Sequence, residues 1–244
     1  MLTAYDFPCA KVLDESGVDI ILIGDSAGNV VMGRPNTLSV TMDEMVHHTR
    51  MVSGAVQNAL VVADMPFLSY QISPEEALRN AGRLVTEGGA QAVKLEGPAD
   101  KFGNAITAIL RAGIPVMGHI GLTPQSVNQI GGYKVQGRTP EGRLRLKQEA
   151  EGLDQIGCFA LVLECIPADL AAEITASISI PTIGIGAGAA CDGQVLVLHD
   201  MLGWGTTKFS KTFGDVRALM QDACQQYVEA VREGTFPEKE HEFK

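Results

Sequence analysis

Four carboxylate residues each come directly after a short apolar run, a placement that suits a metal or acid–base site. They are Asp25, Asp64, Glu96 and Glu164. Carboxylates that converge on one place repel one another and raise one another's pKa values unless a cation compensates them. Oxygen ligands without clustered Cys or His favour a hard divalent ion, Mg²⁺ first, with Mn²⁺ as an alternative. Any one of these acids could instead cap the helix that follows it.

A lysine and a histidine accompany the acids. Lys94 and Glu96 are two residues apart on one expected strand, so their side chains point to the same face. A buried lysine beside a metal-binding acid predicts that the lysine binds an anionic group of the substrate. A structural Lys–Glu pair or a Schiff-base lysine also fits. His119 is flanked by Gly118 and Gly121, which let a substrate approach the backbone closely. We therefore expect His119 to be functional.

Glu164 is the candidate general base. It lies in an apolar frame, residues 161–166, with the sequence LVLECI. Burial in such a frame should raise the pKa of its carboxyl toward the range that suits a base near neutral pH.

The elements that must position these side chains are eight short apolar runs, which we expect to be strands. The runs are continuous rather than alternating, as in strands buried on both faces. They cover residues 2–5, 19–23, 60–63, 92–95, 115–118, 160–163, 182–185 and 195–198. Helix start signals lie between them: Thr41 with Glu44 and Ser73 with Glu76 are typical of capping boxes, and Thr139 opens another helix.

Eight strand–helix units without a linker or composition break predict an α/β fold, a single (β/α)8 TIM barrel over residues 1–244. A doubly wound sheet is the alternative, but eight regular repeats fit closure better. Residues 214–234 should form a closing helix, and residues 235–244 a charged tail. Because catalytic groups of such barrels come from the carboxyl ends of the strands, the acids, Lys94 and His119 should meet at one mouth.

The connection after the fifth expected strand is unusually long. Residues 122–141 are rich in Gly, Pro, Gln and Asn, and they are long enough to form an active-site lid. The glycine-rich stretch at 184–188 lacks the context of a dinucleotide loop, so it is weak evidence for a nucleotide, although it could line a cofactor cleft.

Composition excludes several classes of protein. The chain has 244 residues, 45% hydrophobic and 20% charged, which is typical of a globular domain. Its net charge of −10 disfavours a nucleic-acid partner. The apolar runs are far shorter than the roughly 20 residues of a membrane helix, and the N-terminus shows no signal pattern. We therefore expect a cytoplasmic protein with neither a membrane nor a nucleic-acid partner.

Seven blocks of the sequence resemble the ketopantoate hydroxymethyltransferase family, and the resemblance extends over residues 3–243. The GHIGLTPQS and GGYKVQGR blocks are highly specific. The blocks are GDS at 24–26, ADMPF at 63–67, VKLEG at 93–97, GHIGLTPQS at 118–126, GGYKVQGR at 131–138, LECIP at 163–167, and GIGAG at 184–188 followed by DGQ at 192–194.

The resemblance implies a barrel of the phosphoenolpyruvate mutase/isocitrate lyase-like kind. It would transfer a hydroxymethyl group from 5,10-methylenetetrahydrofolate to 3-methyl-2-oxobutanoate, giving 2-dehydropantoate in pantothenate biosynthesis. The resemblance implies Glu164 as the base. The implied ligands of Mg²⁺, direct or through water, are Asp25, Asp64 and Glu96. The implied contacts of the keto acid are Asp25, Ser26, Asp64, Lys94 and His119.

The resemblance also implies a homo-oligomer, commonly a decamer of two rings. Members usually carry a helix before the first strand, which is expected at residue 2 here, so either another subunit covers the N-terminal mouth or the chain is shortened. Two other functions remain open. One is a Mg²⁺-dependent C–C lyase or mutase of the isocitrate lyase kind, which uses a similar barrel. The other is a keto-acid-binding barrel that has lost catalysis.

Overall fold

The computed structural model describes residues 1–205 and 207–243. The chain divides into two compact units, Met1–Val197 and Leu198–Lys244. All candidate site residues lie in the first unit. The expectation of one domain over residues 1–244 stays a prediction.

The first unit contains an eight-stranded sheet in which every neighbouring pair is parallel and the strands follow chain order. The strands are β1 (Leu2–Thr3), β2 (Ile20–Ile23), β3 (Leu60–Asp64), β4 (Ala92–Lys94), β5 (Val116–Gly121), β6 (Ala160–Glu164), β7 (Thr182–Ile185) and β8 (Gly193–Gln194). A parallel bridge joins Leu2 to Leu196, and Thr3 N donates to Leu196 O at 3.2 Å. The two ends of the sheet therefore meet, as the predicted (β/α)8 barrel requires.

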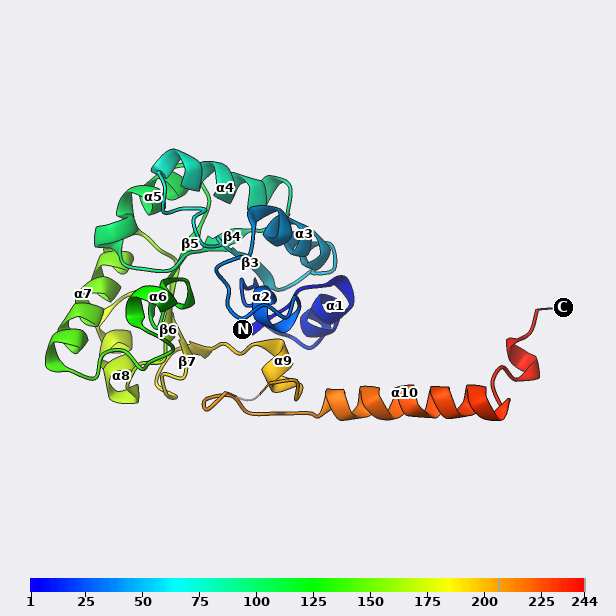
Figure 1. Ribbon diagram of the computed structural model, residues 1–244. Helices are drawn as coiled ribbons and strands as arrows, with labels where there is room; N and C mark the ends of the chain where they lie inside the picture. Colours follow the sequence, from blue (N-terminus) through cyan, green and yellow to red (C-terminus); the bar gives the residue numbers. More distant parts are fainter. Residues whose placement is uncertain (206, 244) are drawn as a thin grey trace. The chain divides into compact units, whose positions relative to one another are not determined.

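Helices surround the strands on the outside of this unit (Figure 1). The longer ones are α1 (Phe7–Glu15), α3 (Met42–Ser53), α4 (Pro74–Thr86), α5 (Ala99–Arg111), α7 (Pro140–Ile156) and α8 (Ala168–Ser177). The shorter ones are α2 (Ala27–Val30), the 3-10 turn η1 (Pro124–Ser126) and α6 (Val127–Ile130).

The predicted helix starts are present, because local side chains satisfy the free N–H groups of each first turn. Thr41 and Glu44 form a reciprocal capping box at α3. Ser73 accepts from the N–H of Glu76 at α4, and Thr139 caps α7 in the same way.

The barrel interior is built in two layers. Alternate residues of a strand point to the same face, so the apolar Val62, Ala92, Met117 and Val162 occupy a buried layer inside the sheet. Two positions further along the same four strands, the residues are polar. They are Asp64, Lys94, His119 and Glu164. The strand pattern thus places a packed core directly beneath the candidate site.

Strand boundaries differ from the sequence prediction at three places. The apolar run at 195–198 was expected to be the eighth strand, but β8 is Gly193–Gln194, and Leu198 begins α9 (Leu198–Met201). Strand β8 pairs with β7 through backbone hydrogen bonds at Gly193 and Gln194, two residues without apolar side chains. Strand β1 ends early because Asp6 caps α1 by accepting from Cys9 N. Strand β5 continues to Gly121, so His119 lies within it rather than after it.

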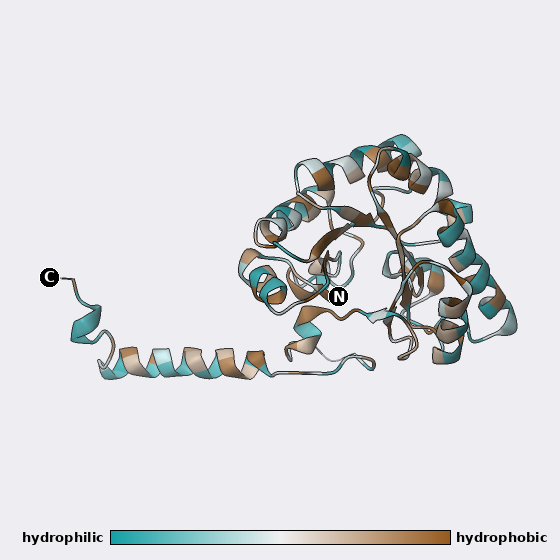
Figure 2. Cartoon of the chain, turned by 180° about the vertical axis from the view of Figure 1, so that it is seen from behind, coloured by the Kyte–Doolittle hydropathy of each residue, from teal (hydrophilic) through white to brown (hydrophobic). Residues whose placement is uncertain are grey.

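The second unit contains α9, α10 (Val216–Glu233) and η2 (Lys239–His241). The helix expected over residues 214–234 is confirmed by α10. In Figure 2 hydrophobic residues gather along one side of α10 and hydrophilic residues along the other. Among the helices of the described residues, none combines the length and the apolar character that crossing a bilayer requires.

Candidate active site

The predicted site residues come together at the carboxyl ends of consecutive strands. Five polar residues are each at most 4% exposed, and these are Asp25, Asp64, Lys94, Glu96 and His119. The side chain of Glu164 is 15% exposed, which makes Glu164 the most accessible of the four acids. The convergence that the strand pattern predicted is confirmed.

Lys94 is held by Asp64 rather than by Glu96, its neighbour on the strand. The distance from Lys94 Nζ to Asp64 Oδ1 is 2.7 Å, and Asp64 Oδ2 accepts from the backbone N–H of Asp25 at 3.0 Å. Burial lowers the pKa of Lys94, but the surrounding carboxylates outweigh burial and raise it. The amine therefore stays a charged ammonium, which fits a grip on an anion and disfavours a Schiff base.

His119 lies between two acids. Its Nδ1 is 3.5 Å from Glu96 Oε1, and its Nε2 is 3.2 Å from Glu164 Oε2. Burial and the charge of Lys94 lower the pKa of His119, but the bonds to Glu164 and Glu96 outweigh them and raise it to about 9. The two carboxylates favour the protonated imidazolium, whereas Lys94 Nζ, which lies 3.3 Å from Nδ1, opposes it.

This pKa predicts a pH dependence of stability. A group whose pKa is raised in the folded state stabilises the fold fully below its unfolded value and loses that contribution as the pH rises through the folded value. For His119 the window runs from the ordinary 6.5 to about 9. We expect its contribution, on the order of 3 kcal/mol at most, to disappear across this window.

The measurement is urea unfolding of the parent and of His119→Asn at several pH values between 6 and 10. The parent should lose more free energy of unfolding than the variant between pH 7 and 9.5. Parallel pH profiles of the two proteins would contradict the cationic state of His119.

The remaining two acids are joined by Gln125, whose role the sequence analysis missed. Gln125 Nε2 donates to Asp25 Oδ2 at 2.9 Å, and Gln125 N donates to Glu96 Oε2 at 2.9 Å. Burial, with Glu96 and Asp64 nearby, raises the pKa of Asp25. Burial also raises the pKa of Glu96, but the bond and charge of His119, the charge of Lys94 and the N–H of Gln125 together outweigh it and lower that pKa overall.

Two tyrosines also support the site without having been predicted. Tyr5 Oη lies 2.8 Å from the hydroxyl of Ser26, and Tyr70 Oη accepts from the backbone N–H of Glu96 at 3.1 Å. Both rings are buried. Aromatic residues in loops carry no chemical signature. Gln125, in contrast, stood inside the GHIGLTPQS block, where its polar side chain close to a strand end was an available signal.

The donor set fits a hard divalent cation. One oxygen of each of three carboxylates is fixed by a protein N–H: Oδ2 of Asp25, Oδ2 of Asp64 and Oε2 of Glu96. When all three are ionised, these carboxylates carry more negative charge than Lys94 and His119 can offset. Within residues 1–205 and 207–243, however, no three His, Cys, Asp or Glu side chains stand grouped as metal ligands. The metal assignment of Asp25, Asp64 and Glu96 therefore stays a prediction.

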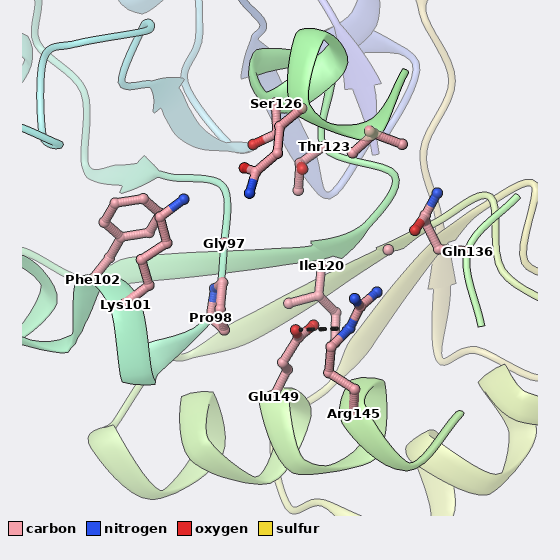
Figure 3. Close-up of a pocket in the computed structure, with 13 residues that line it drawn as sticks. Gly97, Pro98, Lys101, Phe102, Ile120, Thr123, Ser126, Gln136, Arg145 and Glu149 are labelled. Atoms are coloured by element: carbon pink, nitrogen blue, oxygen red, sulfur yellow. Dashed lines mark ion pairs between the residues drawn. The ribbon is translucent and has the colours of Figure 1, made fainter. Parts of the chain in front are cut away.

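A cavity of about 420 Å³ lies beside the site (Figure 3). Its walls include Lys101 and Phe102, the ion-paired Arg145 and Glu149, and Thr123. Ile120, which also lines it, alternates with the inward-facing His119 along β5, so the cavity lies outside the barrel wall. Residues 122–141 form η1, α6 and a loop before α7, and their function as a lid stays a prediction.

Solved structures share this fold. A 2,3-dimethylmalate lyase, described as a member of the PEP mutase/isocitrate lyase superfamily, matches with a TM-score of 0.64 and 19% identity, covering 99% of this chain and 85% of that chain. A phosphonopyruvate hydrolase in complex with oxalate and Mg²⁺ matches with a TM-score of 0.63 and 13% identity, covering 96% and 82%. The fold is therefore a (β/α)8 barrel like those of these two proteins.

Sequence comparison narrows this class to one family. The family model described as ketopantoate hydroxymethyltransferase matches residues 1–239, and the chain belongs to this family. A relative from Clostridium novyi (strain NT), named 3-methyl-2-oxobutanoate hydroxymethyltransferase, is 58% identical over 247 residues, covering 100% of this chain and 90% of the relative. The family resemblance seen in the sequence blocks is confirmed.

Proposed function

We propose that this chain is a 3-methyl-2-oxobutanoate hydroxymethyltransferase. It transfers a hydroxymethyl group from 5,10-methylenetetrahydrofolate to 3-methyl-2-oxobutanoate and gives 2-dehydropantoate in pantothenate biosynthesis. Family membership and the name of the relative at 58% identity support this activity. The observation that carries it is the meeting of Glu164, His119 and Lys94 with three buried acids at one barrel mouth.

Mg²⁺ is the proposed cofactor. Asp25 and Asp64 would hold it, with Glu96 as a further ligand, directly or through water. When bound, the ion supplies Lewis-acid polarisation of the keto and carboxylate oxygens of the substrate. The oxygen-only donor set of the three acids supports this choice.

Glu164 is the proposed base. Its carboxylate accepts the proton from C3 of the keto acid, and the electron pair of the C–H bond moves into the enolate. Lys94 and His119 would offset the negative charge that develops on the enolate oxygen, because nearby carboxylates raise the pKa of the Lys94 ammonium and of the His119 imidazole. Water adds to the one-carbon unit, and both of its C–N bonds to the folate break, which leaves tetrahydrofolate. The enolate carbon then forms the C–C bond to the released carbon, and the oxygen that came from water takes the proton held by Glu164 and becomes the hydroxyl of the product. The folate is proposed to lie over the mouth, under residues 122–138.

Proton NMR of 3-methyl-2-oxobutanoate in D₂O, with enzyme and Mg²⁺ but without folate, tests the first half of the reaction. The C3 proton signal should disappear, and a chelator should stop its loss. Addition of 5,10-methylenetetrahydrofolate should then produce 2-dehydropantoate. Binding without exchange, also in the presence of tetrahydrofolate, would support a barrel without catalysis. Cleavage of a 2-hydroxy dicarboxylate or tricarboxylate would instead support a lyase.

We also propose that the chain forms a homo-oligomer, of which a decamer is the expected form. The apolar side of α10 supports this, because Leu219, Tyr227 and Val231 recur at helical spacing and each is more than 45% exposed. A cytoplasmic location stays a prediction.

Charges on this side should dissociate the assembly. We expect the double variant Leu219→Glu, Val231→Glu to show a lower molar mass than the parent in size-exclusion chromatography with light scattering. Gln225→Glu places the same charge on the opposite side of α10 and should leave the mass unchanged. A parental mass for the double variant would show that α10 does not join the subunits.

A further inference from the structure

We infer that Gln125 is a positioning residue that sets the orientation of the carboxylates proposed to hold Mg²⁺. This inference rests on the proposed function. The Gln125 side chain is buried, and its Nε2 donates to Asp25 Oδ2 at 2.9 Å and to the backbone oxygen of Met65 at 3.0 Å. Its backbone N–H donates to Glu96 Oε2 at 2.9 Å. One residue thus reaches two of the three proposed ligands.

The amide of Gln125 fits in only one orientation. Its Oε1 lies 2.9 Å from Tyr70 Oη and accepts from Gln71 Nε2 at 3.2 Å. The backbone oxygen of Met65 can only accept, so a flipped amide would set two oxygens against each other. Both N–H groups of the amide are therefore used and its oxygen accepts from Gln71, which favours this one orientation of the side chain.

Gln125 links four consecutive strands of the barrel. It follows β5, while Met65 follows β3, and its two carboxylate partners, Asp25 and Glu96, follow β2 and β4. Gln125 contacts one oxygen of each carboxylate, Oδ2 of Asp25 and Oε2 of Glu96. Hydrogen bonds that orient ligating carboxylates typically contribute about 10- to 100-fold to metal affinity.

The test is Mg²⁺ binding by Gln125→Met, which keeps the length of the side chain but removes the amide. Titration calorimetry with Mg²⁺ alone should show affinity at least about 10-fold weaker than that of the parent. Deuterium exchange at C3 of the keto acid should need correspondingly more Mg²⁺ and should recover at saturating Mg²⁺. A merely structural role would not produce this rescue. Gln125→Asn, which retains an amide but shortens its reach, serves if Gln125→Met fails to fold.

Gln71→Met is the matched control, since it removes the same chemical group from a side chain that meets the Gln125 amide at its oxygen end and accepts from the backbone N–H of Tyr70. Its Mg²⁺ affinity should stay close to that of the parent. Parental affinity in Gln125→Met, or an equal loss in Gln71→Met, would overturn the role of Gln125. Absence of Mg²⁺ binding by the parent itself would overturn the magnesium assignment and this inference together, so the two failures are distinguishable.

Discussion

Glu164→Gln should lower the rate of C3 proton exchange by about 10²- to 10⁴-fold, the usual contribution of a general base. The amide keeps the shape of the side chain and an oxygen for His119 Nε2, which lies 3.2 Å from the carboxylate in the parent. Binding of 3-methyl-2-oxobutanoate in the presence of Mg²⁺ should therefore change little. The measurement is exchange of the C3 proton in D₂O by NMR, together with titration of the keto acid.

Glu151→Gln is the matched control, because it makes the same chemical change on the exposed surface of α7. It should exchange at the parental rate. A parental rate in Glu164→Gln would remove Glu164 from the role of base. A loss of keto-acid binding equal to the loss of rate would instead make Glu164 a binding group.

Lys94→Met should destabilise the protein by about 3–5 kcal/mol, the usual cost of removing one partner of a buried ion pair. The variant leaves the carboxylate of Asp64 buried without the ammonium that lies 2.7 Å away in the parent. The loss should shrink in acid, where protonation of Asp64 removes the unpaired charge. Urea unfolding at pH 5 and pH 7.5 measures both effects.

The control for this variant is Lys101→Met, which changes an exposed lysine on α5. Surface changes of this kind usually alter the free energy of unfolding by less than about 0.5 kcal/mol. Equal stability of Lys94→Met and the parent would mean that Lys94 does not compensate the acids. In the folded fraction of Lys94→Met, binding of the keto acid should also weaken, since the substrate is an anion.

Much of the architecture could be predicted because the pattern of apolar residues along the chain depends directly on which side chains are buried. Continuous apolar runs located seven of the eight strands to within a few residues, and capping signals located helix starts such as Thr41 and Thr139. The eighth strand was placed two residues too late: β8 is Gly193–Gln194, Leu196 still bridges to Leu2, and Leu198 already begins a helix. A run such as 195–198 cannot by itself distinguish a strand from the start of a helix.

The sequence could predict only those site residues that stand at the ends of strands. Asp64, Lys94 and Glu164 end apolar runs, so their convergence follows from the barrel. Which groups pair is a different matter, because it depends on distances between separate strands. Sequence spacing joined Lys94 to Glu96, whereas the structure joins Lys94 to Asp64 and places Gln125 between Asp25 and Glu96.

Because the strands carry a core layer and a functional layer, catalysis depends on the correct strand register. Along β3 to β6 an apolar residue lies two positions before a polar one, as with Val62 and Asp64 or Val162 and Glu164. A slip of one residue in any of these strands would turn its core side chain and its functional side chain outward together. A barrel assembled in the wrong register would thus lose packing and chemistry at once. The turnover rate of a refolded preparation, divided by the amount of folded protein, therefore measures the fraction of barrels with the correct strand register.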